Sequence, residues 1–333
     1  MHSILANPLF SLSPDGKTSK EDPMEVFDQA VARGMMTIPY ARACLYAKKL
    51  NIIQSPVLKV RDGMKESAAG LKVLKWLISS GTANDNNFLE DGPFAHIFME
   101  YLVAEGLQEV VWKWIQRAFR GIPRYFTLHV QDPKQEKIRR REIVRPLYLL
   151  IKAEASEEVS LDAAYMCISR AAGYLKGLTA TEMRILLDAP GRFLAHASTS
   201  LNSERPPPST SAFESFVSLV PVLSKDSKYQ LAHLSLIHPS EPSADLALDF
   251  LRWREYPSFD PSLEQTRDKD EIALGLDTAK FLLEHEQYED ADWVMNFLRK
   301  RHSHHLGIKG QDQFKQAMAE VSSLQLLESL SIV

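Results

Sequence analysis

Nine basic residues fall within 29 residues of the first half of the chain, the densest chemistry-bearing pattern in the sequence. Three acidic residues accompany them, so the stretch from residue 117 to 145 has a net charge of +6. Guanidinium and ammonium groups at this density can bind successive phosphates of single-stranded RNA, or contact a protein partner. The candidate binding residues are Arg117, Arg120, Arg124, Lys134, Lys137, Arg139, Arg140, Arg141 and Arg145.

Aromatic residues interleave with this basic stretch and leave two interpretations open. Trp112, Trp114, Tyr125 and Phe126 can stack on bases beside a phosphate-binding surface. Alternatively, the basic residues form a solvated helix face beside a buried aromatic cluster. The helical spacing of the aromatic residues favours the second interpretation, because Trp and Phe in such a pattern usually belong to a core.

Other site chemistry has little support in the sequence. The histidines of the segment Arg301-His-Ser-His-His305 do not share one helix face, and no Cys or acidic partner stands at a defined spacing, so we expect no metal site. The phosphate-binding loop, GxGxxG, GxSxG and HExxH motifs are missing from the sequence. We therefore expect a non-catalytic protein that uses no cofactor, and a helical enzyme without familiar motifs is the remaining enzymatic hypothesis.

Composition and charge indicate a protein that builds an ordinary core and has no global affinity for polyanions. Hydrophobic residues make up 45% and charged residues 25%, and the formal charge is −4. Cys44 and Cys167 lie in apolar helical patterns and indicate packed thiols in a reducing compartment. We expect no membrane span, since no run of about 18 apolar residues occurs. Cytoplasm is the expected location, and the mitochondrial matrix is the alternative if a leader precedes this sequence.

Helical periodicity dominates the chain, and residues 270–301 show it most clearly. They predict two helices joined by a tight turn, and such a hairpin cannot bury both its faces unless it stacks on others. We predict an all-α fold of stacked antiparallel helical hairpins, α-solenoid-like, with about twelve to fifteen helices. The predicted apolar faces of this hairpin contain Ile272, Leu276, Ala279 and Leu283, followed by Tyr288, Ala291, Met295 and Leu298.

The order of these patterns predicts four regions. They are a flexible arm at 1–21, an N-terminal helical region at 22–200, a Pro/Ser-rich linker at 201–211 and a C-terminal helical-repeat region at 212–333. Residues 121–133 break the helical period and predict an extended segment or a packed loop. Pro146 and Pro190 are expected to end, kink or interrupt helices. Between Asp226 and Asp292, sixteen acidic residues outnumber six basic ones, which suits a basic partner, contact between the two halves of the chain, or solubility.

Two hairpins align with each other, since Glu105-Gly-Leu-Gln-Glu-x-x-Trp112 matches Glu286-Gln-Tyr-Glu-Asp-x-x-Trp293. The segment 275–301 resembles a tetratricopeptide-type repeat or the related pentatricopeptide hairpin. The positions that carry the resemblance are Ala279, Leu282, Tyr288, Ala291 and Met295, and in the hairpin at 93–119 they are Leu107, Val110 and Trp114. Gly275 stands where the family has an aromatic residue, and Phe98 where it has a small one.

The resemblance covers about 55 to 60 residues and implies an α-solenoid that binds peptides, proteins or RNA. We therefore expect a scaffold or adaptor that binds a protein partner along a groove. The alternative is an RNA-binding helical-repeat protein of the organellar type that uses the basic stretch at 117–145. The sequence carries no signal for a particular oligomeric state.

Overall fold

The computed structural model describes residues 22–55, 59–127, 132–200, 205–224, 227–255 and 264–302, and these ranges contain no β-strand. Fifteen α-helices account for most of them, which confirms the all-α fold and the expected number of helices. The chain forms two compact units, Met1–Lys225 and Asp226–Val333. The predicted arm at residues 1–21 lies outside the described residues.

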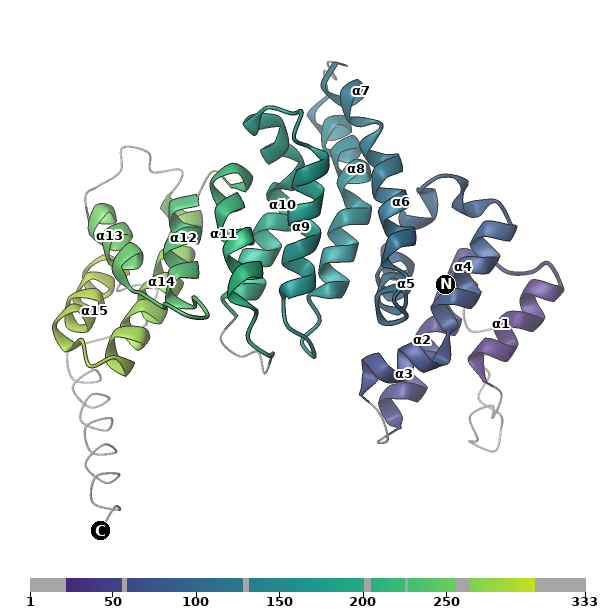
Figure 1. Ribbon diagram of the computed structural model, residues 1–333, viewed down its shortest axis with the longest axis horizontal. Coiled ribbons are helices and arrows are strands. Elements are labelled where there is room, and N and C mark those ends of the chain that lie inside the picture. The colour runs from purple at the N-terminus through teal and green to yellow at the C-terminus, as the bar shows by residue number, and fades with distance from the viewer. Residues whose placement is uncertain are drawn as a thin grey trace, which may run out of the picture. The chain divides into compact units, whose positions relative to one another are not determined.

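The first unit contains helices α1 to α11 (Figure 1). Two short 3-10 helices, Thr82–Asn84 and Asn87–Leu89, lie between α4 and α5. The bounds are α1 (Pro23–Ala32), α2 (Ile38–Gln54), α3 (Val60–Ser67), α4 (Ala69–Ser79), α5 (Gly92–Ala104), α6 (Gln108–Phe119), α7 (Ile122–Thr127), α8 (Pro133–Glu154), α9 (Asp162–Tyr174), α10 (Ala180–Ser198) and α11 (Thr210–Leu223).

The second unit contains helices α12 (Ser227–Leu236), α13 (Asp245–Arg254), α14 (Glu264–Glu284) and α15 (Tyr288–His302). Each helix packs against the next one, and α12 also packs against α14. Their shared core contains Leu248, Leu251, Leu274, Leu282 and Leu298. Small residues let α14 and α15 approach closely, because a Cβ at Gly275 would lie 2.7 Å from Leu298.

In the first unit, helices α2, α5, α8 and α10 pack in succession, each against the next. Two ion pairs join α2 to α5: Arg42 donates to Asp91 at 3.0 Å, and Lys49 donates to Glu100 at 2.6 Å. Since both residue numbers increase together, the two helices run in the same direction. Helices α2 and α5 are therefore parallel neighbours in the first unit.

The predicted linker at 201–211 lies within the first unit, and the division of the chain falls after α11. Arg205 attaches this segment to the helices before it. Its guanidinium donates to the backbone carbonyls of Ala155, Ser156 and Ala197, at 2.9, 3.3 and 3.0 Å. Helix α11 packs against α9 and α10, so it extends the first stack instead of opening the second unit.

Two hairpins share one turn geometry, with a left-handed residue at Gly106 after α5 and at Glu286 after α14. The amide that follows each of these residues donates to a carbonyl five residues earlier, Leu102 and Leu282, at 2.8 Å in both cases. This is the six-to-one hydrogen bond of a Schellman cap. Gly34 repeats this left-handed conformation after α1.

This shared geometry corrects the predicted alignment by one residue, because Gly106 and not Glu105 is equivalent to Glu286. Trp112 and Trp293 are then not equivalent, and only Trp112 is buried. The new register pairs buried residues with buried residues, which are Phe94 with Leu274, Phe98 with Thr278, Leu102 with Leu282 and Val111 with Ala291.

The predicted apolar face of α14 and the start of α15 is partly wrong. Leu276, Leu283 and Tyr288 are exposed. The buried stripe of α14 includes two polar residues instead, Glu271 and Thr278. Thr278 Oγ1 donates to the Leu274 carbonyl within its own helix, and Glu271 is held by cations. A search for apolar residues at helical spacing misses such a stripe, because its buried polar side chains have hydrogen-bond and ion-pair partners within the protein.

Three prolines lie in helices that the sequence analysis did not predict or expected to be interrupted. Pro123 lies in the first turn of α7, in the region predicted to be extended or a loop, where Tyr125 is buried. Helix α8 continues through Pro146, and α10 continues through Pro190 and Gly191. Tertiary packing holds both longer helices, since Pro146 and Pro190 are buried in the first unit.

The left-handed conformation of Glu286 predicts a stabilising substitution. This conformation costs an L-residue about 1 to 2 kcal/mol and costs glycine almost nothing. We expect Glu286→Gly to raise the free energy of unfolding of the second unit by about 1 kcal/mol in a urea titration followed by circular dichroism. The control is Lys280→Gly in the exposed interior of α14, which should lower it by about 1 kcal/mol. A lowered midpoint for Glu286→Gly would contradict the turn geometry.

Candidate anion-binding pocket

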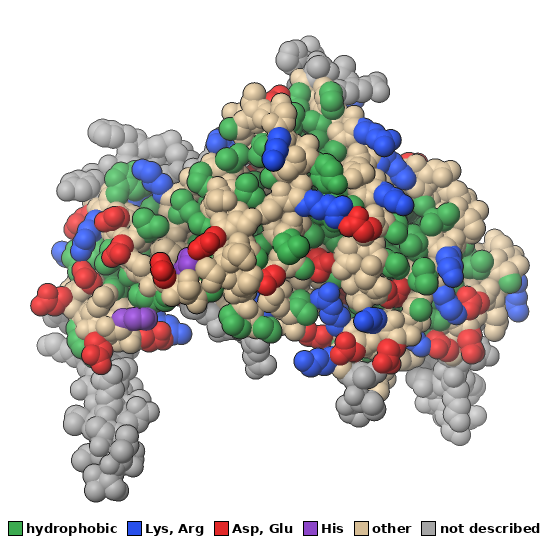
Figure 2. All heavy atoms as spheres, viewed as in Figure 1, with side chains coloured by type: hydrophobic (Ala, Val, Ile, Leu, Met, Phe, Trp, Pro, Cys, Tyr) green, Lys and Arg blue, Asp and Glu red, His purple; other side chains and the backbone are tan. Residues whose placement is uncertain are grey.

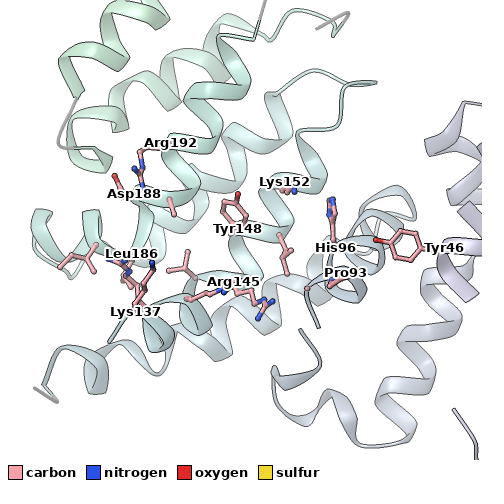
Figure 3. A pocket seen from close by; sticks show the side chains of 17 residues that line it. Tyr46, Pro93, His96, Lys137, Arg145, Tyr148, Lys152, Leu186, Asp188 and Arg192 are labelled. Carbon is pink, nitrogen blue, oxygen red and sulfur yellow. Dashed lines mark ion pairs between the residues drawn. The ribbon is translucent and has the colours of Figure 1, made fainter. Parts of the chain in front are cut away.

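A pocket of about 600 Å³ opens in the first unit between helices α2, α5, α8 and α10. Figure 3 shows Pro93 and His96 of α5 between Tyr46 on one side and the side chains of α8 on the other. Its lining combines apolar side chains such as Val144 and Leu186 with positive charges. The basic residues that line it are Lys137, Arg140, Arg141, Arg145, Lys152 and Arg192.

Helix α8 places five of these six cations, because their spacing follows its turns. The Asp132 side chain caps the helix by accepting from the Lys134 amide at 2.9 Å. Lys137, Arg141 and Arg145 then follow at intervals of four residues, and Lys152 lies two turns further. At 1.5 Å per residue, the row from Lys137 to Lys152 is about 22 Å long. The pocket cations of α8 therefore form a line of charge along one helix.

Most of this charge is not neutralised by the protein. Lys137, Arg140, Arg141 and Lys152 form no ion pair with any described residue. Arg192 pairs with Asp188 at 2.9 Å, and Asp188 is the one carboxylate among the described lining residues. Six cations and one carboxylate make the pocket attractive to anions, because a hollow lined by one sign of charge concentrates its field.

Arg145 is the cation most firmly fixed in this row. Its Nη2 donates to the backbone carbonyl of Glu90 at 3.0 Å, just before α5. Burial lowers the pKa of Arg145, and the positive charge of Arg141 lowers it further. The guanidinium remains charged at any physiological pH, so the lowered pKa reports chiefly the cost of burying that charge. Arg141 adds crowding of positive charge, which Glu90 and Asp91 oppose. A bound anion would relieve that crowding.

His96 adds a neutral polar group to the lining. Burial lowers its pKa, Glu100 opposes that shift, and Lys152 and Lys49 add to it, so the imidazole is neutral at pH 7. Its Nε2 lies 3.6 Å from Glu100 Oε1, and its buried Nδ1 has no hydrogen-bond partner among the described residues. His96 therefore contributes a polar ring to the lining without adding net charge.

The nine predicted binding residues separate into three groups. Lys137, Arg140, Arg141 and Arg145 line the pocket. Arg117 and Arg120 lie elsewhere: Arg117 donates to the Ala83 carbonyl at 2.8 Å, and Arg120 lines a separate cavity of about 300 Å³. Of the remaining three, Lys134 and Arg139 are exposed and do not line the pocket, and the side chain of Arg124 lies outside the described structure.

The aromatic residues of the basic stretch belong mainly to the core. Three of them, Trp112, Trp114 and Tyr125, are buried. The pocket instead contains Tyr46 and Tyr148, which the sequence did not single out.

Lys152 and Arg192 were missed because each follows a proline that was expected to break a helix. The usable signal was helical spacing continued past Pro146 and Pro190.

The other candidate chemistry resolves into structural contacts. His302 is buried and lies 3.1 Å from Glu271, while residues 303–305 lie outside the described residues. The described part of the chain contains no group of three metal-ligating side chains and no helix able to cross a membrane.

His233 lies 2.6 Å from Asp277 and joins α12 to α14. Acidic side chains are spread over the second unit among basic ones on the face drawn in Figure 2.

The cysteines are also part of the core. Cys44 in α2 and Cys167 in α9 are both buried free thiols. Burial raises the pKa of each thiol to about 12.

The contrast between Arg117 and the pocket cations gives a stability test. Arg117→Ser should lower the free energy of unfolding by about 1 to 2 kcal/mol, because it leaves the Ala83 carbonyl without its charged donor. The combined change Lys137→Ser, Arg140→Ser and Arg141→Ser should alter stability by less than about 0.5 kcal/mol, since these cations have no ion pair to lose. Thermal unfolding measures both. A large loss in the triple variant would show that its cations are structural.

Comparison with protein-family models, with curated proteins and with solved structures finds no match for this chain.

Proposed function

We propose that this protein is a non-catalytic helical scaffold or adaptor whose pocket in the first unit binds an acidic segment of a protein partner. The observation that carries the proposal is the row of cations without ion pairs along α8, from Lys137 to Lys152, above an apolar floor. An acidic segment gains charge-assisted hydrogen bonds from the row and burial from the floor. Charge complementarity of this kind sets both specificity and the rate of association.

The apolar floor favours a peptide over a simple polyanion. Val144, Leu149 and Leu186 line the pocket beneath the cations. A peptide supplies apolar side chains and carboxylates at alternate positions along one chain, so it can satisfy both parts of the lining. A cytoplasmic location fits this proposal and the two buried thiols, Cys44 and Cys167.

Single-stranded RNA is the second candidate ligand, and the two tyrosines of the pocket favour it. Tyr46 and Tyr148 lie among the cations, where a base could stack while its phosphates contact the row. The third hypothesis from the sequence, a helical enzyme, has no comparable support. The described pocket lining holds one carboxylate, Asp188, and Arg192 pairs with it.

The binding test compares two triple variants of equal charge. The pocket variant is Lys137→Ser, Arg140→Ser and Arg141→Ser. The control is Lys113→Ser, Lys134→Ser and Arg139→Ser, which removes three exposed cations outside the pocket. For a fluorescent acidic peptide at physiological salt, we expect anisotropy to show at least about tenfold weaker binding by the pocket variant. The control should bind like the parent.

Repeating the titration with single-stranded RNA at two salt concentrations separates the candidates. If RNA is the ligand, the pocket variant should lose about 2 units of logarithmic salt slope, at roughly 0.7 per phosphate contact. No measurable binding of either probe by the parent would remove the proposed function. Equal losses in both variants would show that net charge matters and that the pocket does not.

A further inference from the structure

The first unit has an exposed apolar stripe beside the pocket. Tyr46, Leu50 and Ile53 of α2 are 39%, 55% and 52% exposed. Their spacing of four and three residues puts them on one face of the helix. The other exposed large hydrophobic residues described in the first unit form no such row, and they are Met35, Ile78, Ile138, Met166 and Tyr174. An aligned stripe of this kind indicates a surface that another apolar face covers.

A second cavity connects this stripe to the cation row. It has a volume of about 300 Å³, lies between α2, α3, α5 and α8, and includes Ile53 and Val103 in its lining. Lys152 lines both hollows, so they adjoin at this residue. Tyr46 lines the first and Ile53 the second, so the stripe borders both. We call these two adjoining hollows the groove, and residues of α5 line both of them.

The two walls of the groove differ in character. The wall on α2 is effectively uncharged, because Lys49 within the stripe is neutralised by Glu100 at 2.6 Å. The wall on α8 carries the cations from Lys137 to Lys152 that have no ion pair with described residues. A ligand that matches both walls must be apolar along one side and acidic along the other.

We infer that the groove binds an amphipathic acidic helix of a protein partner. Its apolar face lies on Tyr46, Leu50 and Ile53, and its carboxylates face the row on α8. This is the helix-in-groove mode, in which apolar residues at helical spacing anchor the ligand. A row about 22 Å long corresponds to a helix of about 15 residues, or four turns. The inference rests on the proposed function, since it specifies the acidic segment that the pocket binds.

Two synthetic peptides of identical composition test the inference. Both contain sixteen residues of Glu, Leu and Ala, which favour helix formation. In the first peptide the leucines recur every three or four residues on one face, and in the second they are distributed around all faces. Each is titrated against the full chain by fluorescence anisotropy, and circular dichroism of the mixture reports helix formed on binding.

The protein variants separate the two walls. The stripe variant is Tyr46→Ser, Leu50→Ser and Ile53→Ser, and its control is Met35→Ser, Ile78→Ser and Met166→Ser, with similar exposed apolar area removed elsewhere. We expect the parent and the control to bind the one-faced peptide at least about tenfold more tightly than its isomer. The stripe variant should lose this preference and still bind both peptides through the cations.

The other possible outcomes of these titrations each contradict one part of the inference. Equal affinity of the parent for both peptides overturns the amphipathic helix and leaves the acidic ligand in place. An unchanged preference in the stripe variant overturns the role of α2. If the control variant loses the preference for the one-faced peptide to the same extent, any exposed apolar residue contributes to binding wherever it lies. That result also overturns the role of α2. Binding of neither peptide by the parent overturns the proposed function itself.

Discussion

The burial of one side of helix α8 determines where the positive charge of this protein goes. Val144, Leu147, Leu150 and Ile151 are buried against the helices around α8, which include α5, α6, α9 and α10. Each such side chain contributes about 1.5 to 3 kcal/mol, whereas an exposed Lys or Arg contributes almost nothing to stability. The apolar residues therefore set the rotation of the helix, and the cations occupy the side that remains. The pocket exists because α5 and α10 border that side.

Two clusters of cations are arranged in opposite ways, since one surrounds a buried carboxylate and the other has none. In the second unit, buried Glu271 accepts from Arg254 at 2.7 Å and from Arg301 at 3.0 Å, so α13, α14 and α15 meet at one carboxylate. Removing one member of such a cluster leaves an uncompensated charge and typically costs 3 to 5 kcal/mol. In the first unit, Arg145 donates only to a backbone carbonyl in the described structure. The other pocket cations on α8 form no ion pair with a described carboxylate. The first arrangement stabilises a fold, and the second is available to a ligand.

Local signals in the sequence were sufficient for the fold class and for many helix starts. Asp22 and Thr37 cap α1 and α2, and Thr179 with Glu182 forms a capping box at α10. Residues of these types before an apolar helical pattern are local signals of a helix start. The candidate site was only partly accessible, since four of the nine predicted cations line it. The rest of the lining comes from helices that meet only in the folded chain. No local pattern specifies that Tyr46 of α2 and Arg192 of α10 border the same hollow.

The alkylation rate of the two buried cysteines measures how often the first unit opens, and it reports on that unit alone. Only the thiolate reacts with alkylating reagents, and a pKa of about 12 keeps both thiols protonated at neutral pH while packing shields them. Reaction then requires an opening that exposes α2 or α9, so its rate reports local unfolding there. The sequence has no other cysteine, so the second unit is silent in such an experiment. Opening of the first unit can be timed without introducing a label.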